Sequence, residues 1–118
     1  MSPVRVTRLD QAPPYRPPSH HGVAALRLQG HEAGPTTRFW TGLSHYLPGG
    51  TADATPTVEE TVYVVLDGEV VITADGREET LRLHDSVHLS KGQVRSVENR
   101  SKRTATVLVT IALPPGKD

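Results

Sequence analysis

The chain has 118 residues, in which 13 Lys and Arg balance 13 Asp and Glu, and it has no cysteine. A chain of this length forms one domain, and its balanced charge and 4% aromatic content exclude a basic surface for nucleic acid or for an anionic membrane. No apolar run reaches the roughly 20 residues of a membrane helix, and without a signal segment or disulfides the sequence predicts a cytoplasmic protein.

A proline-rich arm, residues 1–22, precedes the domain that we place at residues 23–118. Two proline pairs surround Tyr15 in this arm, and they prevent a regular helix and favour extended backbone. Either the arm is disordered, or it lies across the domain or a partner subunit, and the tyrosine favours packing. His20 and His21 at its end are candidates to close over the mouth of a pocket.

The remaining sequence predicts short strands separated by turns. Its apolar runs are rich in β-branched residues and have no helical period. Asp67-Gly68 and Asp75-Gly76 each separate two such runs, which predicts two β-hairpins. Close spacing with glycine turns is typical of an all-β sandwich or barrel of the jelly-roll type. The expected strands are residues 23–28, 38–47, 61–66, 69–73, 78–83, 86–89, 94–97 and 104–113.

Two spaced motifs between residues 49 and 99 resemble those of the cupin superfamily. The first family motif runs Gly, five residues, His-x-His, three or four residues, Glu, six residues, Gly, and Gly49 and Gly68 stand at its ends. The second runs Gly, five residues, Pro-x-Gly, two residues, His, three residues, Asn, and Gly92 and Asn99 fit its spacing. The resemblance implies a small single-domain bacterial cupin with a double-sheet jelly-roll β-barrel.

Other residue types occupy the positions at which the family holds its metal ligands. Thr55, Thr57 and Thr61 stand at the two histidines and the glutamate of the first motif, and Arg95 stands at the histidine of the second. A hydroxyl is a weak ligand, and a guanidinium is a permanent cation with no lone pair to donate. We therefore predict no metal and no other cofactor here. Glu60 is one residue away, but a shift of one residue turns a strand side chain to the opposite face.

The substituted positions predict a metal-independent pocket for a small anionic molecule. A guanidinium inside a barrel is costly unless paired, and it suits a bidentate contact with a carboxylate or phosphate, so Arg95 is the expected anchor. Alternatively, Arg95 points to solvent or pairs with Glu60 or Glu98. Glu60 is itself a further candidate for substrate binding. The side chains expected to share the interior space are Thr55, Thr57, Thr61, Tyr63 and Arg95.

His45 and Tyr63 are the candidates for acid–base catalysis. His45 alternates with two leucines, whose apolar character predicts an inward face, and an imidazole that titrates near neutrality moves protons without a metal. Tyr63 would donate a proton or polarise a carbonyl. Each has a structural alternative, as a histidine satisfied by a backbone carbonyl and as a packed tyrosine. Trp40 and Tyr46 fall on the face opposite His45, where they are expected in the core or in a dimer contact.

Three functions fit this reading, and the first is favoured. One is a proton-transfer enzyme of the isomerase, cyclase, epimerase or lyase type, which requires His45 and Tyr63 to converge beside Arg95. Another is a binding module that holds a small ligand without catalysis. The third is an enzyme whose divalent metal has moved to His45, His84 or His88. Small cupins resemble one another in pairing through edge strands or sheet faces, which implies a homodimer.

Overall fold

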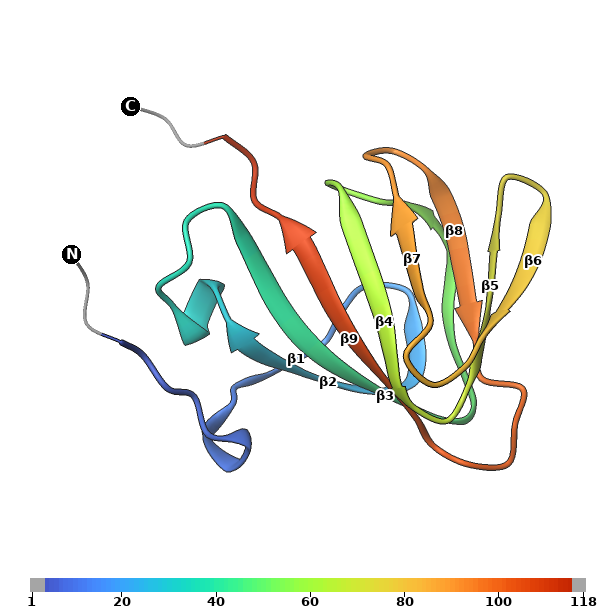
Figure 1. Ribbon diagram of the computed structural model, residues 1–118, viewed down its shortest axis with the longest axis horizontal. Helices are drawn as coiled ribbons and strands as arrows, with labels where there is room; N and C mark the ends of the chain where they lie inside the picture. The colour runs from blue at the N-terminus through green and yellow to red at the C-terminus, as the bar shows by residue number, and fades with distance from the viewer. Residues whose placement is uncertain (1–3, 116–118) are drawn as a thin grey trace.

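The computed structural model describes residues 4–115, and its regular structure is almost entirely β (Figure 1). Two single-turn 3₁₀ helices, Leu9–Gln11 and His31–Ala33, interrupt the strands. No helix in these residues is long and apolar enough to cross a membrane. The strands are β1 (Pro14–Tyr15), β2 (His20–Gln29), β3 (Phe39–Pro56), β4 (Thr61–Asp67), β5 (Val70–Ala74), β6 (Arg77–Leu81), β7 (Ser86–Leu89), β8 (Val94–Glu98) and β9 (Ala105–Ala112).

The long strand β3 joins the two sides of the barrel. Its first half pairs with β9 and its second half with β8, while β2 runs antiparallel along it. The strand order β6-β5-β8-β3-β9-β4-β7 is therefore continuous through β3 (Figure 1). The predicted all-β jelly-roll barrel is confirmed. Alternate residues of these strands point inward and form a single core between the two sides, because strand side chains alternate in direction.

One of the two predicted hairpins forms and the other does not. Asp75 and Gly76 connect β5 to β6 with φ values of 54° and 69°, the left-handed pair that a two-residue hairpin turn requires. Asp67-Gly68 instead connects β4 to β5, and these two strands do not pair with each other. Strand β4 pairs with β7 and β9, and β5 pairs with β6 and β8. The hairpin predicted at Asp67-Gly68 is wrong because burial of the apolar faces places the two strands on different sides.

The arm packs onto its own domain. Pro14 pairs with Leu26 and Tyr15 with Ala25, so β1 extends the sheet beyond β2. The ring of Tyr15 meets the ring of Trp40 edge to face at 5.6 Å between centroids. Of the alternatives left open by the sequence, the structure has the arm lying across the domain. Strand β2 begins at His20, within the segment expected to be arm.

Candidate functional site

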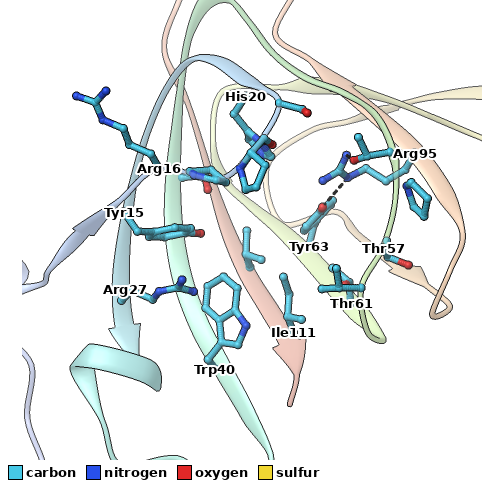
Figure 2. Close-up of a pocket in the computed structure, with 18 of the residues that line it drawn as sticks. Tyr15, Arg16, His20, Arg27, Trp40, Thr57, Thr61, Tyr63, Arg95 and Ile111 are labelled. Carbon is cyan, nitrogen blue, oxygen red and sulfur yellow. Dashed lines mark hydrogen bonds between the residues drawn. The ribbon is translucent and has the colours of Figure 1, made fainter. Parts of the chain in front are cut away.

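A cavity of about 400 Å³ lies between the two sides of the barrel and is closed on one side by the arm (Figure 2). Four aromatic rings contribute to its wall: Tyr15 from the arm, Trp40 and Tyr46 from β3, and Tyr63 from β4. Among the described residues that line it there is no aspartate or glutamate. Its ionisable side chains, apart from the tyrosines, are three arginines and one histidine: Arg16, Arg27, Arg95 and His20. The side chain of Arg16 is exposed and points away from the cavity (Figure 2).

Most of the side chains predicted for the pocket meet in this cavity. The register of β3 against β8 places Thr55 directly opposite Arg95, and Tyr63 reaches the same space from β4. Strand alternation explains this convergence, because Thr61, Tyr63 and Val65 are the buried positions of β4. The prediction that these side chains share one interior space is confirmed for Thr55, Thr57, Thr61, Tyr63 and Arg95.

Arg95 is buried, with 9% of its surface exposed, and its hydrogen-bond partners among residues 4–115 are all neutral. Its Nε donates to the hydroxyl of Tyr63 at 2.9 Å, and its Nη1 donates to the carbonyl of Asp53 at 3.0 Å and to Oγ1 of Thr55 at 3.1 Å. It neither points to solvent nor pairs with Glu60 or Glu98, so those alternatives are wrong. Among the described residues, this guanidinium has no carboxylate partner.

The threonine hydroxyls are oriented by the backbone. Thr57 Oγ1 donates to the carbonyl of Ser90 at 2.6 Å, and Thr61 Oγ1 donates to the carbonyl of Glu59 at 2.9 Å. Since a hydroxyl has a single hydrogen, both oxygens present only lone pairs to the cavity. A molecule that reaches these oxygens would therefore meet hydrogen-bond acceptors. No group of three or more His, Cys, Asp or Glu side chains in residues 4–115 is arranged to hold a metal ion.

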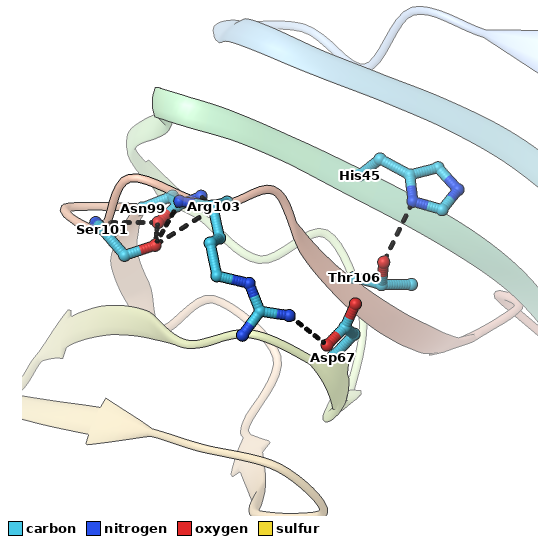
Figure 3. Close-up of polar contacts among 6 residues, drawn as sticks. All are labelled: His45, Asp67, Asn99, Ser101, Arg103 and Thr106. Carbon is cyan, nitrogen blue, oxygen red and sulfur yellow. Dashed lines mark hydrogen bonds and ion pairs between the residues drawn. The ribbon is translucent and has the colours of Figure 1, made fainter.

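His45 lies outside the cavity, and the expectation that it faces inward is wrong. In the first half of β3 the buried positions are Trp40, Gly42, Ser44 and Tyr46, so His45 points to the outer surface, where Nδ1 lies 3.1 Å from Oγ1 of Thr106 (Figure 3). Neighbouring leucines misled the assignment because this outer sheet surface is itself partly apolar. The opposite placement of Trp40 and Tyr46, as core residues, is confirmed.

Glu60 also lies outside the cavity, contrary to its expected role in binding. Its carboxylate is exposed and contacts Nε2 of His88 at 2.6 Å. The outward position follows from strand parity, because the adjacent Thr61 takes the inward direction. His84 occupies the predicted turn with φ of 68°. His45, His84 and His88 do not form a relocated metal cluster within the described residues.

His20 is the ionisable group in the cavity that sequence reasoning assigned only loosely, as a residue over the pocket mouth. Its Nδ1 lies 2.8 Å from the carbonyl of Pro18, and since a carbonyl only accepts, Nδ1 carries the hydrogen and Nε2 keeps its lone pair. Burial lowers the pKa of His20, and the charge of Arg95 lowers it further. His21 is exposed and contacts Asp53 at 3.1 Å. His20 is therefore a neutral base directed by the backbone.

The titration of His20 provides a direct check. We expect its imidazole to titrate with a midpoint below the ordinary pKa of 6.5, followed by proton–carbon NMR and assigned with His20→Gln. Replacing Arg95 with glutamine should raise this pKa, since a repelling charge is removed, but should leave it below 6.5 because burial is the larger cause. A wild-type midpoint at or above 6.5 would contradict the burial of this ring.

The end of the cavity below the arm is built around Arg27. Its guanidinium carbon lies 3.9 Å from the ring centroid of Tyr15 and 4.2 Å from that of Trp40, and its Nε donates to Glu32 at 2.7 Å. Gly42 makes this arrangement possible, because a side-chain carbon there would lie 2.8 Å from the Trp40 ring. Burial raises the pKa of Tyr15, so this phenol stays protonated. Sequence reasoning missed Arg27, since only the tertiary fold brings β2 to the cavity.

The amino-acid sequence matches a known protein family and a named protein. The family model described as "Cupin domain" matches residues 42–111. Beta-D-galactosidase Rv1717 of Mycobacterium tuberculosis is 60% identical over 111 residues, which cover 94% of this chain and 96% of that protein.

Two solved structures share the fold. A predicted oxalate decarboxylase of Thermotoga maritima has a TM-score of 0.79 and 23% identity, covering 93% of this chain and all of that one. A sugar phosphate isomerase of the cupin superfamily from Silicibacter pomeroyi has a TM-score of 0.68 and 26% identity, covering 80% of this chain and 61% of that one.

Proposed function

The chain belongs to the cupin family, and on this premise we propose that its cavity binds a β-D-galactoside and hydrolyses the glycosidic bond. The observation that carries the proposal is the 60% identity, over nearly the full length of both chains, to a protein named Beta-D-galactosidase. A volume of about 400 Å³ is of the size that holds a small organic ligand such as a sugar. The substrate is therefore a small galactoside rather than a long polysaccharide segment.

The composition of the wall supports a sugar as the ligand. A galactose ring has an apolar face of C–H groups and a rim of hydroxyls, and an aromatic ring packs against the first of these. Trp40 and Tyr15 provide such rings at one end of the cavity. Thr57 and Thr61 provide oxygens that only accept hydrogen bonds, which suits donation from sugar hydroxyls. The wall therefore has partners for both parts of the ring.

Hydrolysis in this cavity has to use an acid and a base other than carboxylates. Most glycosidases employ two Asp or Glu residues, whereas none lies among the described residues of this wall. We assign the base to Nε2 of His20, which holds a lone pair and is neutral near pH 7. We assign the acid to the hydroxyl of Tyr63, because the Nε–H of Arg95 donates to that oxygen and stabilises negative charge developing on it.

In the proposed reaction, His20 accepts one proton and Tyr63 donates one. Water attacks the anomeric carbon while His20 takes one of its protons, and a new carbon–oxygen bond forms. The bond from that carbon to the leaving oxygen breaks, and the oxygen takes the proton of Tyr63. His20 is then protonated and Tyr63 is a phenolate beside Arg95, and exchange with solvent restores both. Galactose and an alcohol are released, without any redox step.

The test is hydrolysis of p-nitrophenyl β-D-galactoside by the purified protein, with the α-anomer and the β-glucoside as controls. We expect release of nitrophenol from the β-galactoside, an unchanged rate in His45→Gln, which alters an imidazole outside the cavity, and a strongly reduced rate in His20→Gln. The rate should survive incubation with EDTA, since hydroxyls and a guanidinium do not bind a divalent metal. Loss of the rate in EDTA with recovery on adding Zn²⁺ or Mn²⁺ would overturn the metal-independent mechanism.

A second candidate function is isomerisation of an anionic sugar by proton transfer. Two observations favour it: Arg95 is a buried cation with no acidic partner in the described part of the chain, and a sugar phosphate isomerase shares 26% identity and the fold. The same base and acid would move a proton between carbon atoms, with no water consumed. Turnover of a galactose phosphate to an isomer, without nitrophenol release in the first assay, would select this function. Galactose binding without either reaction would indicate a binding module.

A further inference from the structure

A neutral sugar does not account for the buried positive charge in the cavity. A neutral galactoside requires hydrogen-bond donors and acceptors but no net charge. The wall nevertheless contains the guanidinium groups of Arg27 and Arg95 and no carboxylate among its described residues. Placing even one cation in a buried site is costly unless something pairs with it. The pairing of each cation therefore indicates which of them is available to a ligand.

Arg27 and Arg95 lie at opposite ends of the cavity and differ in their pairing (Figure 2). Arg27 is neutralised by Glu32 at 2.7 Å and covered by the rings of Tyr15 and Trp40. Arg95 is more deeply buried, but its partners in the described chain are a phenol, a carbonyl and a threonine hydroxyl. Within the described chain, Arg27 has its counter-charge and Arg95 does not.

The donors of Arg95 that remain are open to the cavity. Its protein hydrogen bonds in residues 4–115 use Nε and Nη1, and none uses Nη2. Nη2 is also accessible to solvent, because it is absent from the buried side-chain atoms that have no hydrogen-bond partner. A ligand can therefore reach it. Nη2 carries two N–H groups, and the positive charge of the guanidinium is delocalised over it and the other two nitrogens. They match the oxygens of a carboxylate, sulfate or phosphate.

We propose that the preferred galactoside carries an anionic group, a carboxylate, sulfate or phosphate, that binds Nη2 of Arg95. The inference rests on the proposed galactoside site and names the class of its substrate. The anion sits beside Tyr63, because the same guanidinium holds the phenol oxygen through Nε. Arg95 thereby has two functions, in binding the anion and in positioning the acid.

The test compares sugars that differ in charge but share the galacto configuration. Titration calorimetry measures the dissociation constants of galactose, galacturonate and galactose 6-phosphate for the wild-type protein. We expect at least one anionic sugar to bind about tenfold or more tightly than galactose, since a charged hydrogen-bonded pair is added in a buried site. Equal affinities for all three sugars would overturn the proposal.

Three variants test whether the preference depends on Arg95. Arg95→Gln should reduce the preference for the anionic sugar to about onefold, whereas Arg77→Gln, which removes the same charge from an exposed side chain of β6 outside the cavity, should preserve it. Retention of the preference in Arg95→Gln would contradict the assignment. Arg95→Lys keeps the charge while losing the planar donor pattern, and should retain part of the preference. Circular dichroism checks that each variant is folded.

A measurement on the wild-type protein keeps the proposal testable if Arg95→Gln does not fold. In a proton–nitrogen spectrum, the Nε–H signal of Arg95 should shift when galacturonate is added and should shift much less with galactose. The absence of a difference would refute the anion site. Glucuronate separates this inference from the proposed function: if it binds as tightly as galacturonate, the anion site stands and galactose selectivity fails. If galactose binds and its charged analogues gain nothing, the galactoside site stands and the anion site fails.

Discussion

Replacing Asn99 with alanine should destabilise the fold by about 3–5 kcal/mol, because four hydrogen bonds converge on a side chain with no exposed surface. Its Nδ2 donates to the carbonyls of Tyr46 at 2.9 Å and Arg103 at 2.7 Å. Its Oδ1 accepts from the backbone N–H of Ser101 at 2.9 Å and from the hydroxyl of Ser101 at 2.7 Å (Figure 3). Alanine would leave buried carbonyls without partners.

Urea denaturation measures this effect as a shift of the midpoint at constant slope. Ser101→Ala is the matched control, because it removes one half-buried partner of the same network, and it should cost only about 1 kcal/mol. A domain of this size has a total stability of roughly 5–15 kcal/mol, so the Asn99 variant is expected to be marginal at 37 °C. A cost for Asn99→Ala no greater than that for Ser101→Ala would contradict the large contribution assigned to the Asn99 side chain.

The position of Asn99 also shows what motif spacing conveys. The sequence resemblance marked Asn99 as a family position without assigning a function to its side chain. In the structure it fastens the loop between β8 and β9 to the carbonyl of Tyr46, one of the cavity rings. The adjoining backbone pairs in the same way, since Gly49 and Gly50 exchange hydrogen bonds with Asn99. The motif residue thus holds the frame on which the cavity is built.

Strand positions were predictable where a local pattern decides them. The expected strand at residues 86–89 matches β7, and the turn at Asp75-Gly76 forms because its left-handed backbone is favoured by its own residues. The continuation of β3 through Pro48 to Pro56 was missed, because prolines and glycines usually end a strand. Pairing with the backbone of Asn99 carries the strand through this segment, and that partner is distant in sequence.

Some residues of the candidate site could likewise be predicted from the sequence, and others could not. Motif spacing and strand alternation place Thr61, Tyr63 and Arg95 correctly, since both act within or between neighbouring strands. They fail for His45, because alternation gives the two faces of β3 but does not say which is inward when both carry apolar residues. His20 and Arg27 come to the cavity only through packing of the arm and of β2, which no local pattern encodes.

Replacing Tyr63 with phenylalanine should lower kcat for galactoside hydrolysis by about 10²–10⁴-fold, the usual effect of losing a general acid. The variant keeps the ring and removes only the hydroxyl that accepts from Arg95 at 2.9 Å, so the cavity keeps its shape. KM should change far less than kcat, because the proton is transferred only in the transition state. Tyr46→Phe is the matched control: it removes a hydroxyl from the same wall, from a ring for which no hydrogen bond to Arg95 is found in the described chain, and should cost far less.

The pH dependence of kcat/KM distinguishes the role of His20 as the base from that of Tyr63 as the acid. His20 must be neutral to accept a proton, and burial lowers its pKa below 6.5, so kcat/KM should be constant near neutrality and fall as the pH drops through that lowered pKa. His20→Gln should remove this acidic limb together with most of the rate, whereas Tyr63→Phe should keep the limb at its wild-type position on a much lower rate. If Tyr63→Phe retains the wild-type kcat, the proton of the leaving group comes from elsewhere. Loss of the limb in His45→Gln, on the outer surface of β3, would return the base to the histidine that the sequence first suggested.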